Sequence, residues 1–175
     1  MTAADTGLLI VRLVVGLTFA AHGAQKVLGW WSGPGFAGWT AAMSRMGLRP
    51  PRMWAALSSG VELGGGLLFA AGSLTPIAAA LLVGQCVYIV LRVHLPKGFW
   101  NKNGGIEFPL QLLAGSLLIA VSGPGAIAID PAAGLEFEVS WRVAFVVIAV
   151  LAALATMAIA RPAPQPAPVA APPPR

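Results

Sequence analysis

Five apolar segments run through this chain and constrain its fold more than any other feature. They extend from about Thr6 to Leu28, Met53 to Ala71, Pro76 to Val93, Ile106 to Val121 and Ser140 to Ala160. A transmembrane α-helix needs roughly 17–25 apolar residues, a length that only the fourth segment falls short of. Charged residues make up 10% of the chain, against roughly 25% in soluble domains. The sequence therefore predicts an all-α membrane protein, an antiparallel bundle of four transmembrane helices plus a fifth C-terminal transmembrane helix.

Charges in the connections between these segments predict the orientation. Residues 29–52 and 94–105 are basic, whereas residues 122–139 contain acidic residues and no lysine or arginine. The positive-inside rule then places the N-terminus outside and the C-terminus in the cytoplasm of a bacterial plasma membrane, with several passes. The net charge of +5 is spread over loops and helix ends, which favours membrane lipid over nucleic acid as the partner. A short amphipathic helix is expected around Phe36 to Met46.

Polar residues inside the apolar segments predict an intramembrane pocket. Glu62 follows Arg52 by ten residues, which at 1.5 Å per residue places it about 15 Å deep. A charge at that depth costs about 2.5–3.5 kcal/mol on insertion scales and normally finds a partner inside the bundle. We predict that Glu62 points inward and pairs with Arg12, with Gln85 or Tyr88 as a further hydrogen-bond partner. Gly60 and Gly64 flank Glu62 in a spacing that permits close helix contact.

A second polar group is predicted at the cytoplasmic end of the bundle. Its candidates are His22, Lys26, Arg92, His94, Glu107 and Gln111. Plainer interpretations stay open, since a buried ion pair can serve only to fix helix register. Long basic side chains at helix ends often only reach for the membrane interface. The aromatic residues Trp30, Trp31, Phe36 and Trp39 are typical of an interfacial belt.

Cysteine and histidine are too scarce for several kinds of site. The chain has one cysteine, Cys86, and two histidines, so an internal disulfide and a thiolate metal site are excluded. No metal and no covalent cofactor are expected, and the catalytic residues, if there are any, cannot be named. A redox role would need a bound organic molecule such as a quinone. The proline-rich residues 161–175 are expected to form a disordered cytoplasmic tail.

Four stretches carry a resemblance to the DoxX family of small bacterial membrane proteins. They are "VRLVVGLTFAAHGAQKVLG", "AALSSGVELGGGLLFAAGSLTPIAAALL", "KGFWNKNGGIEFPLQLL" and "GPGAIAID", the last of which ends at Asp130. The resemblance covers about residues 7–131. It implies a four-helix membrane domain at residues 1–131. The outer loop and the fifth transmembrane helix at 132–160 and the tail at 161–175 depart from the family's four-helix pattern.

The resemblance implies a link to membrane-associated redox chemistry. Relatives of this kind include a subunit of thiosulfate:quinone oxidoreductase and a protein tied to a sulfurtransferase and superoxide dismutase. We therefore expect a membrane subunit of a sulfur, thiol or quinone-linked complex related to oxidative stress. Quinone would bind the polar pocket, and a soluble redox or sulfurtransferase partner would dock on the basic loops. Such a chain would be an accessory subunit of a quinone-linked oxidoreductase, and whether it has catalytic activity of its own stays open.

Two other functions are compatible with the same sequence. The chain can be a structural membrane anchor that recruits a soluble enzyme, with the charged pair only holding the bundle together. It can also be a transporter of protons or small solutes, in which case five helices are few and a homo-oligomer is expected.

Overall fold

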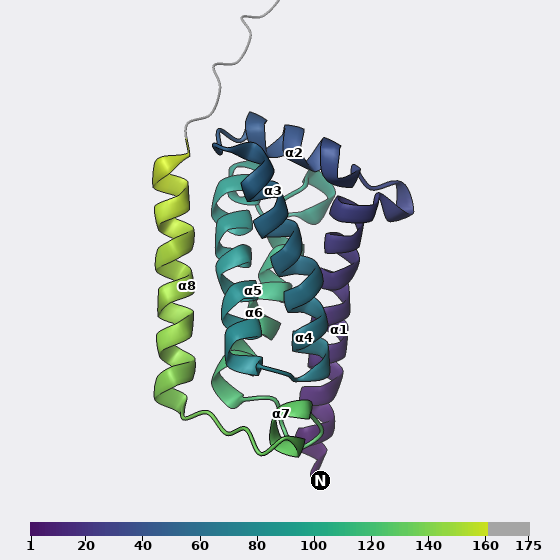
Figure 1. Cartoon of the computed structure of the whole chain (residues 1–175), viewed down its shortest axis with the longest axis vertical. Coiled ribbons are helices and arrows are strands. Elements are labelled where there is room, and N and C mark those ends of the chain that lie inside the picture. The colour runs from purple at the N-terminus through teal and green to yellow at the C-terminus, as the bar shows by residue number, and fades with distance from the viewer. Residues whose placement is uncertain (161–175) are drawn as a thin grey trace, which may run out of the picture.

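The computed structural model describes residues 1–160 as a helical bundle, and the predicted tail lies outside this range (Figure 1). Four helices are long and apolar enough to cross a membrane: α1 (Ala3–Leu28), the continuous helix Pro51–Ala71, the helix Thr75–Lys97 and α8 (Val139–Ile159). A fifth, α6 (Glu107–Ser122), is apolar but has only 16 residues. The predicted all-α membrane fold is confirmed, including the short fourth segment.

Two of the long helices contain a wider turn. Pro51–Ala71 consists of α3 (Pro51–Gly60), a π-helical turn (Val61–Gly65) and α4 (Gly66–Ala71). The helix from Thr75 consists of α5 (Thr75–Ile89), a π-helical turn (Val90–His94) and a last 3-10 turn (Leu95–Lys97). Such turns are frequent at functional sites. Here one carries Glu62 and the other carries Arg92 and His94.

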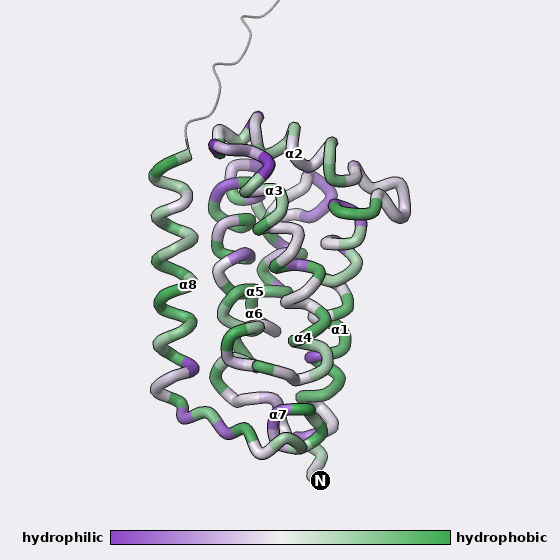
Figure 2. Tube along the Cα trace, in the orientation of Figure 1, coloured by the Kyte–Doolittle hydropathy of each residue, from purple (hydrophilic) through white to green (hydrophobic). Residues whose placement is uncertain are grey.

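α8 stands at the edge of the bundle and packs mainly against α5. In its most apolar stretch, only 6% of the residues are buried inside the protein. Ile148 and Leu151 on this helix are 62% and 59% exposed, and apolar residues run along its whole length (Figure 2). Lipid must cover these side chains, because water would not tolerate so large an apolar surface.

Short elements close the two ends of the bundle. α2 (Gly35–Arg45) lies across one end, close to the helix predicted there, and buries Met43 against Leu48 and Ala55. α7 (Ile129–Ala132) lies at the other end. We call the α2 end the basic end, because its exposed loops carry Arg45, Arg49, Arg52, Lys97 and Lys102. We call the α7 end the acidic end, because Asp130, Glu136 and Glu138 lie there.

Backbone contact between glycines fixes the height of α1 against its neighbour. A Cβ atom added to Gly16 would lie 2.6 Å from the carbonyl oxygen of Gly66, and one added to Gly66 would lie 2.6 Å from that of Gly16. Gly23 packs equally closely on Leu63. Small residues allow membrane helices to approach in this way.

The predicted glycine pair, Gly60 and Gly64, is wrong. Both glycines face open space, with nothing within 4 Å of an added Cβ atom. Residues two apart in a helix point to opposite sides, so Gly60 and Gly64 face away from the inward-pointing Glu62. Gly66 follows Glu62 by four residues, which places it on the same face, against α1.

Replacing these glycines tests the packing. Gly66→Ala should destabilise the folded protein by about 1–3 kcal/mol, the usual range for overpacking, because its methyl group meets the α1 backbone. Gly64→Ala, two residues away in open space, is the matched control and should leave stability unchanged. Unfolding of the detergent-solubilised variants by SDS measures both. Equal stability of the two variants would contradict the contact.

Candidate functional site: an ion pair beneath an apolar pocket

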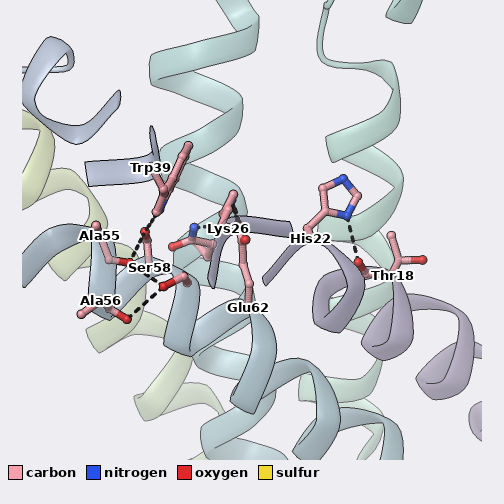
Figure 3. A network of polar contacts seen from close by, with 10 residues as sticks. Thr18, His22, Lys26, Trp39, Ala55, Ala56, Ser58 and Glu62 are labelled. Carbon is pink, nitrogen blue, oxygen red and sulfur yellow. Dashed lines mark hydrogen bonds and ion pairs between the residues drawn. The ribbon is translucent and has the colours of Figure 1, made fainter. Parts of the chain in front are cut away.

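A buried ion pair joins α1 to the first π-helical turn. Lys26 Nζ lies 2.5 Å from both carboxylate oxygens of Glu62. The Gln85 side-chain amide on α5 donates a third hydrogen bond to Glu62 Oε1 at 3.0 Å. The Glu62 side chain is 2% exposed and that of Lys26 is 14% exposed. The carboxylate is thus neutralised and held from two other helices, as Figure 3 shows for Lys26 and Glu62.

Glu62 does point inward and bond Gln85 as predicted, but its predicted pairing with Arg12 is wrong. Helix register explains the error, because Gly23 lies level with Leu63 whereas Gly16 lies level with Gly66 and Ala70. Arg12 is one turn beyond Gly16 and lies beside Ala70. Eight residues separate Glu62 from Ala70, or about 12 Å along the helix, which is beyond the reach of an arginine side chain. Lys26, predicted as a member of the polar group at the cytoplasmic end, is the real partner.

Arg12 instead supports the chain turn at the acidic end. It is fully buried and donates hydrogen bonds to the carbonyl oxygens of Ala70, at 3.3 Å, and Ile127. Gly72 in this turn has a positive φ of 67°, and an added Cβ atom would collide with the guanidinium. Arg12 therefore holds this turn together, and it does not belong to the pocket around Glu62.

Asp130 completes this turn from the far side of the sequence. Its carboxylate accepts the backbone N–H groups of Leu74 and Thr75 at 2.7 and 2.8 Å, and so caps the start of α5. Leu74 has φ 46°, a left-handed conformation that costs a residue with a side chain roughly 1–2 kcal/mol. The two hydrogen bonds offset that cost. They also hold the Asp130 carboxylate inside the turn, and the residue is only 1% exposed.

The polar group predicted at the basic end does not gather into one cluster. His22 bonds the Thr18 carbonyl through Nδ1 at 2.8 Å and points away from Glu62 (Figure 3). His94 bonds the Gly104 carbonyl at 2.6 Å, and Glu107 accepts the Asn101 N–H at 2.9 Å. These contacts hold the loop between α5 and α6. Gln111 is exposed on α6, and only Lys26 of the predicted group reaches the Glu62 site.

An apolar pocket of about 190 Å³ lies above the ion pair. α2 roofs it with Trp39 and Met43. The walls are apolar residues of α3, α5 and α8, and the polar groups that reach it are Lys26, Ser58, Gln85, Tyr88 and Thr156. A largely apolar pocket with a few convergent polar groups is the usual form of a small-molecule site.

Lys26 ties the ion pair to the roof of this pocket. Its ammonium group lies 4.2 Å from the centre of the Trp39 ring, in addition to its contact with Glu62. The Trp39 indole N–H donates to the Ser58 hydroxyl at 2.8 Å. A cation over an aromatic face adds roughly 0.5–2 kcal/mol. The roof helix and the buried charges are therefore linked through one side chain.

One polar atom in the pocket wall has no partner. The Tyr88 hydroxyl is buried and makes no hydrogen bond with any described residue. Arg92 lies near this hydroxyl, but the two groups fall short of hydrogen-bond geometry. A buried hydroxyl that lacks a partner costs about 1–3 kcal/mol, and a ligand or water in the pocket would relieve that cost.

Sequence reasoning missed the aromatic roof and the wall from α8. Trp39 was interpreted as part of an interfacial belt. The spacing of Trp39, Met43 and Met46, at four and three residues, is that of one helix face, and it could have indicated a buried side of α2. No sequence signal assigns the α8 alanines to the pocket, because small residues occur all along that helix.

The capping role of Asp130 can be tested by removing its carboxylate. Asp130→Ala should lower the stability of the folded state by about 3 kcal/mol, because two buried N–H groups lose a charged acceptor. Glu136→Ala removes an exposed carboxylate of the same end and should be neutral. Thermal unfolding in detergent measures both variants. A neutral Asp130→Ala variant would exclude the cap as a stabilising contact.

A double-mutant cycle tests the ion pair. Lys26→Met should destabilise by about 3–5 kcal/mol, since it leaves the Glu62 carboxylate buried without a counter-charge. Adding Glu62→Gln removes that charge, so the double variant should recover most of the loss. SDS titration of the two single variants and the double variant gives the coupling energy. Additive losses would show that the two side chains do not interact.

Comparison with known proteins is consistent with this architecture. The family model described as DoxX matches residues 7–95. An uncharacterized membrane protein of Mycobacterium tuberculosis, Rv3486, is 32% identical over 70% of this chain and 78% of its own length. The Bacillus subtilis protein named "Putative oxidoreductase CatD" is 29% identical over 73% and 87% of the two chains.

A third relative is the Escherichia coli inner membrane protein YqjF, which is 30% identical over 72% of this chain and 91% of its own length. No solved structure matches the chain significantly. The family-model match over half of the chain and the relatives that align along most of it lead to one conclusion: this multi-pass membrane protein belongs to the DoxX family.

Proposed function

We propose that this protein is the membrane subunit of a redox complex and that its pocket binds the ring of a quinone. The observation that carries the proposal is the pocket itself, an apolar space of about 190 Å³ whose lining includes Lys26, the partner of the buried Glu62. An apolar cavity of about 150 Å³ holds benzene, so this pocket has room for one substituted ring. A relative with oxidoreductase in its printed name supports the same class of function.

The polar groups suit a neutral ring with two carbonyl oxygens. The Tyr88 hydroxyl is free to donate, and the Gln85 amide has a second N–H beyond the one that bonds Glu62. The Lys26–Glu62 pair has no net charge, so an ionic ligand would leave an unbalanced charge in a low-dielectric site.

The electrons must come from a partner, because the sequence has no motif for a haem, flavin or iron–sulfur cluster. We propose a soluble thiol protein as that partner. A dithiol that becomes a disulfide gives up two electrons and two protons, which together convert one quinone to hydroquinone. In this proposal the thiols reach the ring by displacing the α2 roof, which closes the pocket toward the basic end. The exposed Arg45, Arg49 and Arg52 at the basic end would attract an acidic protein surface. We propose accordingly that the basic end faces the cytoplasm at a bacterial inner membrane, which is the orientation that the charge distribution predicts.

The second candidate function is a structural anchor, and the buried charges at the acidic end are the observation that favours it. Arg12 and Asp130 show that buried charges in this bundle can serve structure alone. In that case the Lys26–Glu62 pair would likewise only fix the position of α1. A transporter remains the third interpretation, tested by uptake into liposomes.

Native extraction with paired variants tests the proposal. Protein extracted gently from its own membranes should carry about one quinone per chain, together with a soluble thiol protein, as scored by mass spectrometry. Lys26→Met with Glu62→Gln should lower the retained quinone about tenfold, because the polar end of the pocket is lost without an unpaired charge. Glu107→Gln removes a carboxylate that bonds only Asn101 and should retain quinone as the wild type does.

The other outcomes separate the candidates. A co-purifying partner without quinone would favour the anchor. Quinone that stays bound in the double variant would remove the ion pair from the site. If the extracted protein carries neither quinone nor partner, and the protein takes up solute when reconstituted in liposomes, the transporter becomes the favoured function.

A further inference from the structure

The pocket above Glu62 is closed toward the basic end but open on one side. Its roof residue Met43 is 3% exposed, and Leu48 beside it is also 3% exposed. Two leucines that line the pocket are different, because Leu57 on α3 is 53% exposed and Leu81 on α5 is 41% exposed. In a membrane-spanning bundle these side chains face hydrocarbon. The pocket therefore opens sideways, into the lipid.

α8 forms the third side of this opening. Its residues on the pocket are small, namely Ala149, Ala152, Ala153 and Thr156. The helix sits close to α5, since a Cβ atom added to Gly84 would lie 2.9 Å from the Ala149 carbonyl oxygen. Ala152 is nevertheless exposed while it lines the pocket. Between α3 and α8 there is thus a passage with small or apolar side chains on each rim.

The two ends of the pocket call for different chemistry. The buried part of the pocket is lined by Lys26, Gln85 and Tyr88, and the Tyr88 hydroxyl, which has no partner among the described residues, needs a polar group. The side opening holds Leu57, Leu81 and Ala152, which need an apolar group. A phospholipid fits poorly, because its acyl chain would leave the Tyr88 hydroxyl unpaired and its charged head would have to stay at the surface. A neutral ring with a hydrocarbon tail satisfies both ends.

We infer that the ligand is a tailed quinone of the membrane, whose tail leaves the bundle between α3 and α8 across Leu57, Leu81 and Ala152. This inference rests on the proposed function and specifies its substrate class and its route. The ring enters from the lipid through the same opening, without passage through the α2 roof. Ala152 then determines specificity, because a larger side chain there fills the path of the tail.

The test compares two probes on matched variants. The probes are decylubiquinone and its benzoquinone head without the tail, with binding followed by quenching of tryptophan fluorescence, since Trp39 and Trp54 line the pocket. Variants are held in nanodiscs at one lipid concentration, so that partition of each probe into lipid is the same throughout. Ala152→Phe narrows the opening. Ala155→Phe places the same ring on an exposed position of α8 that does not line the pocket.

Selective loss of the tailed probe is the expected result. Ala152→Phe should raise the dissociation constant of decylubiquinone about tenfold and leave that of the tail-free head unchanged. Ala155→Phe should match the wild type with both probes. Leu57→Phe narrows the opposite rim and should act like Ala152→Phe, with Leu67→Phe as its control, because Leu67 is 51% exposed and does not line the pocket.

The remaining outcomes distinguish this inference from the proposed function. If the wild type binds both probes and neither rim variant weakens the tailed one, the route between α3 and α8 is wrong while quinone binding stands. If the rim variants weaken both probes equally, the opening admits the ring but does not hold the tail. If the wild type binds neither probe, and mass spectrometry of the nanodisc protein shows bound phospholipid only, both proposals fall.

Discussion

Contact between the backbones of α1 and α4 at Gly16 and Gly66 sets the height of one helix against the other, and the polar contacts of the bundle follow from that height. Because Gly16 lies against Gly66, the last turn of α1 comes level with Val61–Gly65. Lys26 therefore meets Glu62, and Arg12 falls well below it. A methyl group at either glycine would push the helices apart and move these charges out of reach.

The two polar centres of the bundle solve the same electrostatic problem in different ways. A charge in the hydrocarbon region is expensive unless it is paired or bonded to backbone. Arg12 bonds backbone carbonyls in a turn that also needs the Asp130 cap, so its charge is used for architecture. Glu62 is neutralised by a lysine that also contacts the roof of a pocket. Only the second arrangement places charged groups where a ligand could reach them.

α8 gives the pocket a wall that the other helices do not supply. It packs on α5 through small residues and leaves its large apolar side chains to the lipid. Because its residues at the pocket are small, α8 borders the pocket without filling it. The C-terminal helix thus contributes one wall to a pocket whose other lining residues lie within the first hundred residues of the chain.

The sequence by itself determined the class of fold and the existence of buried polar residues. Long apolar segments must form helices in lipid, because backbone groups have no other partners there, and their predicted limits agree with the structure to within a few residues. Glu62 and Gln85 were also placed together correctly, since both lie at similar distances from charged helix ends.

Only the tertiary structure decided which charge meets which. The depth of Glu62 was counted from Arg52 as if that residue lay level with the end of α1, but α3 begins beyond the end of α1, beneath the crossing helix α2. That offset has no period that can be counted along the chain. It results from how complete helices fit against one another, and that fit gave Glu62 a lysine and not an arginine as its partner.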